Sequence, residues 1–354
     1  MFKPPDYRDL LRGKKRGVAA TLLRAALRIA EPFYTLAVWW RNRRYDRGRA
    51  EVHPAGVPVV CVGNLTVGGT GKTPMVEWLA RWFRARNVRV AIVSRGYGAE
   101  RGALNDEALE LEQKLPDVPH VQNPDRVEAA RVAVEELDCQ LILLDDGFQH
   151  RRLARDLDLV LLDALDPFGL DHLLPRGLLR EPLSGLRRAA VVALSRADQV
   201  DAERRDEVRT QVAKIAPNAV WVEVAHKPSE LLDSDGRSVS LEVLRDRRAA
   251  AFCGIGNPDG FRGTLEALTA ELVDFREFAD HHPYSARDIV DLEAWAESLP
   301  DIDAVLCTHK DLVKIGLPKL GGHPLWALRI GIEATAGKAE LEQLLEAIAA
   351  KVQT

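Results

Sequence analysis

Cysteines are few in this sequence, and no two of them lie close together. The four cysteines form no C-x-x-C pair, and each lies in or beside an apolar run: Cys61, Cys139, Cys253 and Cys307. This pattern argues against a disulfide framework and against a thiolate metal site. We expect four buried thiols in a protein of a reducing compartment.

The sequence also lacks an uninterrupted apolar run long enough to cross a membrane. Its longest apolar stretch, residues 19–40, is broken by Arg24, Arg28, Glu31 and Pro32. An arginine at the centre of a spanning helix costs ~2.5–3.5 kcal/mol, so a transmembrane helix is disfavoured. No small-residue cleavage site follows this stretch, which argues against a cleavable signal peptide.

Internal repeats and low-complexity linkers are absent as well, and the composition, 46% hydrophobic and 29% charged, is that of a soluble globular protein. A chain of 354 residues is long for one domain, so we expect two α/β domains. The net charge of −4 is unevenly distributed. Residues 1–49 contain 13 Lys/Arg and 4 Asp/Glu, a net of +9, which leaves −13 for the remainder.

Residues 1–49 are predicted to be a basic, membrane-associating segment. Its apolar residues fall at helical spacing and predict an amphipathic helix: Leu22, Leu23, Ala26, Leu27 and Ala30. Interfacial aromatics and cations that could meet anionic lipid headgroups follow: Trp39, Trp40, Arg41, Arg43 and Arg44. A helix packed on the protein's own core would explain the same pattern, so both interpretations stay open at this point.

After residue 50, short apolar runs alternate with helical patterns. Strand candidates are residues 57–64, 88–94, 140–146, 157–163 and 189–195. They predict a core domain over residues 50–215, in which a parallel sheet is covered by helices on both faces. One helix is expected to use Asn123 as its cap and Pro124 in its first turn. A second series of strands predicts a smaller α/β domain, residues 216–354, ending in a helix near 338–351.

The stretch TVGGTGKTP, residues 66–74, lies between a predicted strand and a predicted helix. Glycines let backbone N–H groups and the positive end of the helix dipole approach a phosphate closely. Lys72 would then reach the β- and γ-phosphates, and the Thr73 hydroxyl would ligate Mg²⁺. A simple turn does not require Lys-Thr here, so a P-loop NTPase-like fold is favoured. The predicted nucleotide-binding residues are Thr66, Val67, Gly68, Gly69, Thr70, Gly71, Lys72 and Thr73, with Thr66 where the common pattern has its first glycine.

A metal carboxylate is expected at the end of another strand. Asp145 and Asp146 directly follow the apolar residues of the strand at 140–146, which resembles a Walker B strand. We therefore predict a Mg²⁺ site formed by Thr73, Asp145 and Asp146. Which aspartate contacts the metal stays open.

Several longer motifs occur in a fixed order between residues 63 and 285: GNLTVGGTGKTP, VSRGYG, NDEAL, NPDR, LLDDGFQHRRLARDLDLVLLD, LPRGLLREP, CGIGNP and DHHPYS. Together they resemble the tetraacyldisaccharide 4′-kinases of lipid A biosynthesis. The resemblance implies a peripheral enzyme on the cytoplasmic face of the inner membrane. It also implies transfer of the γ-phosphate of MgATP to the 4′-hydroxyl of an acylated glucosamine disaccharide 1-phosphate. A threonine before Val-Gly-Gly-Thr-Gly-Lys-Thr is this family's own version of the loop.

The resemblance also implies roles for single residues. Asp106 matches the catalytic base, His281 matches the histidine that pairs with it, and Lys72 matches the phosphate-binding lysine. Because Asp106 falls in the first α/β series and His281 in the second, we expect the pair to be complete only when the two domains face each other. Other residues implied for the site are Tyr97, Glu107, Arg126, Gln149, His150 and Glu181. For Arg126, a substrate phosphate and a solvated position in the first turn of a helix are both open.

Two positions depart from the family pattern. The chain reads Asn105-Asp106-Glu107-Ala108 where many members read Gly-Asp-Glu-Pro, which weakens the assignment of Asp106. His309 replaces a usual glutamate, and we interpret it as a surface substitution. The second histidine of DHHPYS, His282, is interpreted as structural or solvated.

Two other classes of function remain as alternatives. A partitioning-type regulatory P-loop ATPase has a similar loop, but Val67 occupies the position of that class's first lysine. A membrane-binding scaffold would explain only the basic N-terminal helix. SRAD, residues 195–198, and THKD, residues 308–311, lack the asparagine of a guanine-reading motif. We expect ATP and Mg²⁺ as cofactors, a lipid disaccharide and a membrane surface as partners, no nucleic acid, and a monomer.

Overall fold

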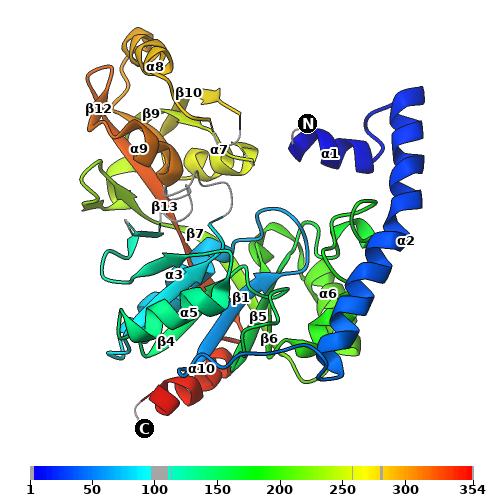
Figure 1. The fold of residues 1–354 in the computed structure, drawn as a ribbon. Helices are drawn as coiled ribbons and strands as arrows, with labels where there is room; N and C mark the ends of the chain where they lie inside the picture. Colours follow the sequence, from blue (N-terminus) through cyan, green and yellow to red (C-terminus); the bar gives the residue numbers. More distant parts are fainter. Residues whose placement is uncertain (1–3, 97–110, 113, 257, 280–281, 353–354) are drawn as a thin grey trace. The chain divides into compact units, whose positions relative to one another are not determined.

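The computed structural model describes residues 4–96, 111–112, 114–256, 258–279 and 282–352 (Figure 1). The chain divides into two units. The first comprises residues 1–104, 115–226 and 332–354, and the second comprises residues 105–114 and 227–331. We predicted a single boundary near residue 215. The chain instead leaves the first unit after His226 and returns to it at Ile332.

The first unit contains a parallel sheet in the order β3-β2-β4-β1-β5-β6-β7. Its strands are β1 Val59–Asn64, β2 Val90–Ser94, β3 His120–Gln122, β4 Leu141–Asp145, β5 Leu157–Asp163, β6 Val191–Ser195 and β7 Val220–Leu232, which continues into the second unit. Each run predicted as a strand in residues 57–195 is confirmed. The central strands β1, β2, β4 and β6 are buried along their whole length, because both faces of the sheet are covered.

Helices cover both faces of this sheet, as predicted. They are α3 Lys72–Arg84, α5 Arg126–Glu135 and α6 Ala202–Ile215. On one face, Val59 and Cys61 of β1 share a core with Ala130 of α5 and Val208 of α6. Successive side chains of a strand point to opposite faces. Val60 therefore points to the other face, where α3 contacts β1, β2 and β4.

The helix α5 begins two residues later than predicted. Asp125, not Asn123, is its N-cap, and the Asp125 side chain accepts a hydrogen bond from the Val127 N–H. Asn123 instead accepts from the Asp125 N–H at 2.9 Å. Pro124 thus lies outside the helix, where its missing N–H is not needed.

The C-terminal helix α10, Lys338–Val352, belongs to the first unit, although we placed it in the second domain. Leu341, Leu345 and Ile348 are buried. Ion pairs at 2.8 Å join Lys351 to Asp156 and Arg86 to Glu346. Periodicity identifies the apolar face of a helix but does not identify the sheet that the face covers.

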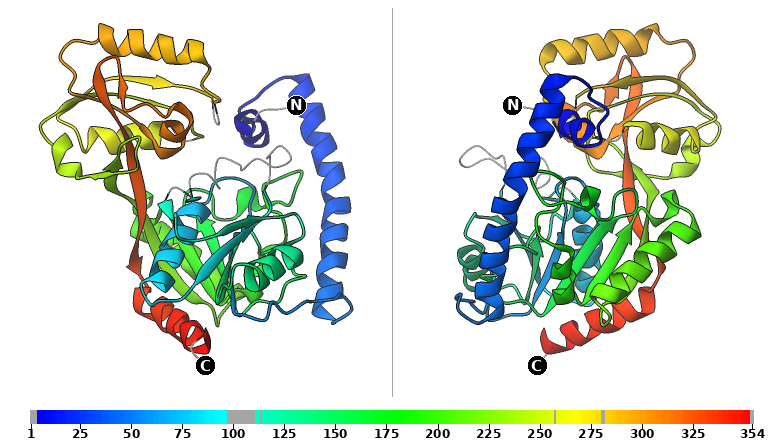
Figure 2. Two further views of the ribbon diagram at one scale, coloured as in Figure 1. Left: turned by 60° about the vertical axis from the view of Figure 1, so that its left-hand side comes forward. Right: turned by 90° about the vertical axis from the view of Figure 1, so that its right-hand side faces the viewer.

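Two helices form the N-terminal segment, α1 Pro4–Leu11 and α2 Val18–Asp46. In both views of Figure 2, α2 runs alongside the rest of the first unit, to which it belongs. Tyr34 donates to the Arg180 carbonyl at 2.9 Å, and Glu31 pairs with Arg176 at 3.1 Å. No helix in the described ranges is long and apolar enough to span a membrane. The contacts of Tyr34 and Glu31 show that one face of α2 packs on the protein, as one of our two interpretations expected.

The opposite face of α2 is apolar and exposed. Residues at helical spacing on it are Val18, Leu22, Ile29, Phe33, Leu36 and Trp40. Leu22 and Leu27, which we predicted to share an apolar face, differ in environment, because Leu22 is exposed and Leu27 is half-buried. The amphipathic pattern thus contains two apolar faces, one packed and one open.

The second unit contains a parallel sheet in the order β10-β9-β11-β13. Its strands are β9 Arg248–Cys253, β10 Glu271–Glu277, β11 Ala304–Thr308 and β13 His323–Ala336, whose last residues belong to the first unit; β8 Ser238–Val239 and β12 Lys319–Leu320 are short. Its helices are α7 Pro258–Glu266, α8 Ala286–Ser298 and α9 His309–Ile315. Phe252, Leu292 and Val305 belong to its core. This arrangement agrees with the smaller α/β domain that we expected.

The four cysteines are all free and buried, as predicted.

Candidate active site

The loop at residues 66–73 joins the end of β1 to the start of α3. Gly71 is the N-cap of α3 and has φ 82°, a left-handed conformation that favours glycine. A Cβ atom at this position would lie 2.6 Å from the ring of His226, so a side chain does not fit. Lys72 and Thr73 occupy the first turn of α3, at the positive end of the helix dipole.

Thr66 occupies the position of the usual first glycine for a structural reason. It forms an antiparallel bridge with Leu179, and the Val67 N–H donates to the Leu178 carbonyl at 2.8 Å. The Asn64 side chain donates to the Thr66 carbonyl at 2.8 Å. At Thr66 the backbone therefore continues to pair like a strand, and a glycine is not required.

Asp146 lies between two cations at the end of β4. Its carboxylate is 3.5 Å from the Lys72 ammonium, and one guanidinium nitrogen of Arg180 donates to both carboxylate oxygens at 2.8 Å. Burial alone would raise the pKa of Asp146, but Lys72 and Arg180 outweigh it and hold the pKa below its ordinary value. Asp146 also has a positive φ of 49°, which is uncommon for a residue other than glycine. We did not predict Arg180, although it precedes Glu181 in a motif that we singled out.

Asp145, the last residue of β4, is 6% exposed. No group of three or more His, Cys, Asp or Glu side chains in the described ranges could hold a metal ion. Mg²⁺ commonly binds through one or two carboxylates together with substrate phosphates. The carboxylate and hydroxyl oxygens of Asp145, Asp146 and Thr73 fit that requirement as a donor set.

Arg126 is 7% exposed, so our alternative of a solvated arginine is wrong. Its guanidinium donates to the Pro124 carbonyl at 3.1 Å, while its Nε has no hydrogen-bond partner among the described residues. Burial lowers the pKa of Arg126, while the charges of Asp145 and Asp146 act in the opposite direction. Arg126 is therefore a buried cation within electrostatic range of the paired aspartates.

His150 lies in the field of Arg126. Burial, followed by the charges of Arg126 and Arg152, lowers the pKa of His150 to about 4. The imidazole is therefore neutral at neutral pH. Its Nε2 is buried and has no hydrogen-bond partner among the described residues.

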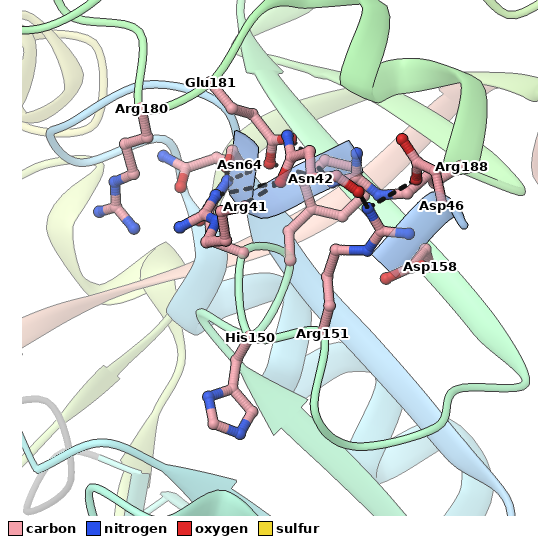
Figure 3. A network of polar contacts seen from close by, with 12 residues as sticks. Arg41, Asn42, Asp46, Asn64, His150, Arg151, Asp158, Arg180, Glu181 and Arg188 are labelled. Carbon is pink, nitrogen blue, oxygen red and sulfur yellow. Dashed lines mark hydrogen bonds and ion pairs between the residues drawn. The ribbon is translucent and has the colours of Figure 1, made fainter. Parts of the chain in front are cut away.

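Glu181 is fully buried and connects three parts of the first unit (Figure 3). Its carboxylate accepts from Asn42 of α2 at 3.1 Å and from Gln149 at 3.0 Å. Arg188 forms an ion pair with it at 2.9 Å. Gln149 also donates to the Asn64 carbonyl at 2.9 Å, beside the loop. In this structure Glu181 and Gln149 are thus held by protein partners, and Asn42 and Arg188 are participants that we did not predict.

Four predicted site residues, Tyr97, Asp106, Glu107 and His281, lie outside the described residues.

Two histidines of the second unit have environments that the structure defines. His309 is 7% exposed, so its interpretation as a surface substitution is wrong. It is the first residue of α9, and Thr308 caps that helix. His282 lies 3.2 Å from Asp288, and its ring packs against Tyr284, in keeping with a structural role.

Comparisons with known proteins place the chain in a family. The model of the family described as tetraacyldisaccharide-1-P 4′-kinase matches residues 23–350. The chain is 44% identical over 358 residues to a tetraacyldisaccharide 4′-kinase of Anaeromyxobacter sp. (strain K), covering 94% of this chain and 93% of that protein. For the protein of the same name from Geobacter sulfurreducens the identity is 37%, with coverages of 87% and 89%. Among solved structures, LpxK from Aquifex aeolicus in complex with ATP matches with a TM-score of 0.72 and 31% identity, covering 92% of this chain and 99% of that one.

Proposed function

The chain belongs to the tetraacyldisaccharide-1-P 4′-kinase family, and we propose that residues 66–73 bind the triphosphate of its ATP. It is an ATP-dependent kinase of lipid A biosynthesis that phosphorylates the 4′-hydroxyl of tetraacyldisaccharide 1-phosphate. The convergence of Lys72, Asp146 and Arg180 where β1 and β4 end carries the proposal. Ligands of a parallel α/β sheet bind beyond the carboxyl ends of its strands.

Lys72 and the backbone N–H groups of the loop would stabilise the charge that develops on the transferred phosphoryl group. Thr73, Asp145 and Asp146 would hold Mg²⁺, which neutralises charge on the phosphate oxygens when it is bound. We assign Arg126 to a substrate phosphate. Its burial and the missing partner of its Nε among the described residues support this role, because an unsatisfied buried donor is costly.

We assign the proton transfer to Asp106, with His281 as its hydrogen-bonded partner. The 4′-oxygen of the sugar attacks the γ-phosphorus while its proton passes to the Asp106 carboxylate. The bond between the γ-phosphorus and the β,γ-bridging oxygen breaks, and ADP leaves. These two assignments, and those of Tyr97 and Glu107 as lining residues, rest on the sequence motifs alone.

We further propose that α2 attaches the enzyme to the cytoplasmic face of the inner membrane. The exposed apolar face of α2 supports this, since Ile29 is 69% and Phe33 is 73% exposed. Near the end of the helix, the Arg43 guanidinium carbon lies 4.7 Å from the Trp39 ring centroid, an arrangement suited to a lipid headgroup region. A net charge of −13 on residues 50–354 does not favour a nucleic acid partner. We also propose that the enzyme is a monomer.

An assay with γ-labelled ATP and tetraacyldisaccharide 1-phosphate tests the proposal. We expect label on the 4′-oxygen of the lipid. Release of inorganic phosphate regardless of lipid would instead fit a partitioning-type ATPase, and vesicle binding without turnover would fit a membrane scaffold. No observation favours either alternative.

A further inference from the structure

Arg196 contacts the glycine loop from the end of β6, which is separated from β1 in the sheet by β5. It is the residue after β6, and its guanidinium donates to the Gly69 carbonyl at 2.8 Å. The same guanidinium donates through Nε to Asp163, the last residue of β5, at 3.0 Å. Arg196 thus bridges the loop to a carboxylate that is fixed by the sheet.

The Arg196–Asp163 half of this bridge is shielded, the hydrogen bond to the Gly69 carbonyl is exposed, and the backbone at Arg196 is locally strained. The side chains of Arg196 and Asp163 are only 15% and 12% exposed. The backbone of Arg196 has φ 59°, in the left-handed region. Strain of this kind in a residue other than glycine persists where surrounding contacts demand it, and it clusters at functional sites.

A phosphate-binding loop must direct its N–H groups inward, which directs its carbonyl groups outward. Arg196 holds one such outward carbonyl, that of Gly69. The Gly69 carbonyl and the Thr70 N–H belong to one planar peptide unit, so fixing the carbonyl also fixes the direction of the N–H.

A second contact limits the loop on the same side. Ser195 and His226 share a hydrogen bond of 3.0 Å. A Cβ atom on Gly71 would lie 2.8 Å from the Ser195 hydroxyl and 2.6 Å from the His226 ring, so the loop packs directly on this pair. The loop is therefore supported at both Gly69 and Gly71.

We propose that Arg196 is a positioning residue for ATP, acting with Asp163 to hold the Gly69–Thr70 peptide in the orientation that binds phosphate. The first two residues of the SRAD motif, Ser195 and Arg196, are thus the ones that contact the phosphate-binding loop. The inference rests on the proposed binding of ATP at residues 66–73.

The test is the equilibrium dissociation constant of MgATP, measured by calorimetry on the full chain without lipid acceptor. We expect Arg196→Ala to weaken ATP binding by about 10-fold, because the hydrogen bond from a charged donor that fixes the Gly69 carbonyl is lost. Arg196→Lys, which keeps the charge but cannot bridge both partners, should lie between this variant and the wild type. Arg204→Ala is the matched control, because Arg204 pairs with Glu207 on the exposed surface of α6.

Three further readouts separate positioning from a general loss of structure. In Arg196→Ala the KM for ATP should rise. The KM for the lipid should stay within about twofold of the wild-type value, and the thermal midpoint within about two degrees. Asp163→Asn should weaken ATP binding, and the double variant Arg196→Ala/Asp163→Asn should bind ATP no worse than Arg196→Ala alone. If Arg196→Ala does not fold, Arg196→Lys and Asp163→Asn decide the question.

Wild-type affinity for ATP in these variants would overturn the inference. Lys72→Ala in the same experiment tests the underlying proposal separately. If Lys72→Ala also binds ATP normally, the loop is not the ATP site. If only Lys72→Ala loses affinity, the loop binds ATP without needing Arg196.

Discussion

One guanidinium nitrogen of Arg180 donates hydrogen bonds to both carboxylate oxygens of Asp146, each at 2.8 Å. The backbone N–H of Arg180 also donates to the Leu65 carbonyl at 2.7 Å, immediately before the glycine loop. The segment that contains Arg180 therefore connects the strand-end aspartate to the loop through both side chain and backbone. Lys72 lies close to the same carboxylate. Asp146 therefore interacts with one cation from the loop and one from the segment that contains Arg180.

Lys72→Ala should lower kcat by about 10²- to 10³-fold, since it removes a positive charge that stabilises the transferred phosphoryl group. Asp146→Ala should also lower kcat strongly. Steady-state assays with labelled ATP and lipid acceptor measure both effects. Arg84→Ala, at the other end of α3, is the control and should retain wild-type turnover. Near-normal kcat in a folded Lys72→Ala protein would contradict the assignment of the loop to the triphosphate of ATP.

Glu181→Ala should lower the free energy of unfolding by about 2–3 kcal/mol, because it leaves the partly buried Arg188 without its partner. Asn42 and Gln149 lose an acceptor in the same variant. Urea unfolding monitored by circular dichroism measures the change. Glu207→Ala, which removes an exposed ion pair on α6, should change stability by less than about 1 kcal/mol. Equal effects of the two substitutions would contradict the role of Glu181 as a connector.

The stability of the protein should fall as the pH falls from 6.5 towards 4, in part because of His226. Burial, with a smaller contribution from Arg196, lowers the pKa of His226 from 6.5 to about 4. Between these values the unfolded chain binds a proton at this residue and the folded chain does not, so stability rises with pH in that window. His226→Gln should therefore reduce the dependence of the unfolding midpoint on pH between 4 and 6.5. Above pH 7.5 both proteins should show the same slope. An unchanged slope in the lower window would show that His226 titrates normally.

Phe33→Asp should weaken the binding of the protein to anionic vesicles, because it places a charge in the exposed apolar face of α2. Vesicle co-sedimentation measures the bound fraction. Val290→Asp is a matched control, since Val290 is an exposed apolar residue on α8 in the second unit, with an exposed fraction of 61%. Equal binding of wild type and Phe33→Asp, or equal losses in the two variants, would show that α2 is structural only.

The parts of the fold that could be predicted are those set by local pattern. The strands β1 and β4, the loop between β1 and α3, and the aspartates after β4 follow from apolar runs, glycine spacing and charge that are close in sequence. The contacts that complete the site join distant residues. Asn42 and Glu181 are 139 positions apart, and Gly69 and Arg196 are 127 apart.

The burial of charged and titratable side chains was the other property that sequence pattern could not provide. Arg126 and His309 are charged or titratable residues at helix starts, where exposure is the common outcome, yet each is only 7% exposed. Glu181 is buried because three donors from separate elements surround its carboxylate. Such compensation becomes visible only when the tertiary contacts are known.

Asp106 and His281 should behave as a single catalytic unit. If His281 acts only by holding and polarising the carboxylate of Asp106, removing either residue disables the same proton transfer. Asp106→Ala, His281→Ala and the double variant should therefore show similar losses in kcat, of about 10²- to 10⁴-fold.

The affinity for ATP should remain near that of the wild type in all three variants, because neither residue is assigned to the triphosphate. Calorimetry on the same protein preparations checks this and also confirms that the variants are folded. His282→Ala is the control for the histidine, since His282 packs against Tyr284 and pairs with Asp288. Multiplicative losses in the double variant would mean that Asp106 and His281 act independently. Full kcat in His281→Ala would remove that histidine from the mechanism, and the base would then have to work without an imidazole partner.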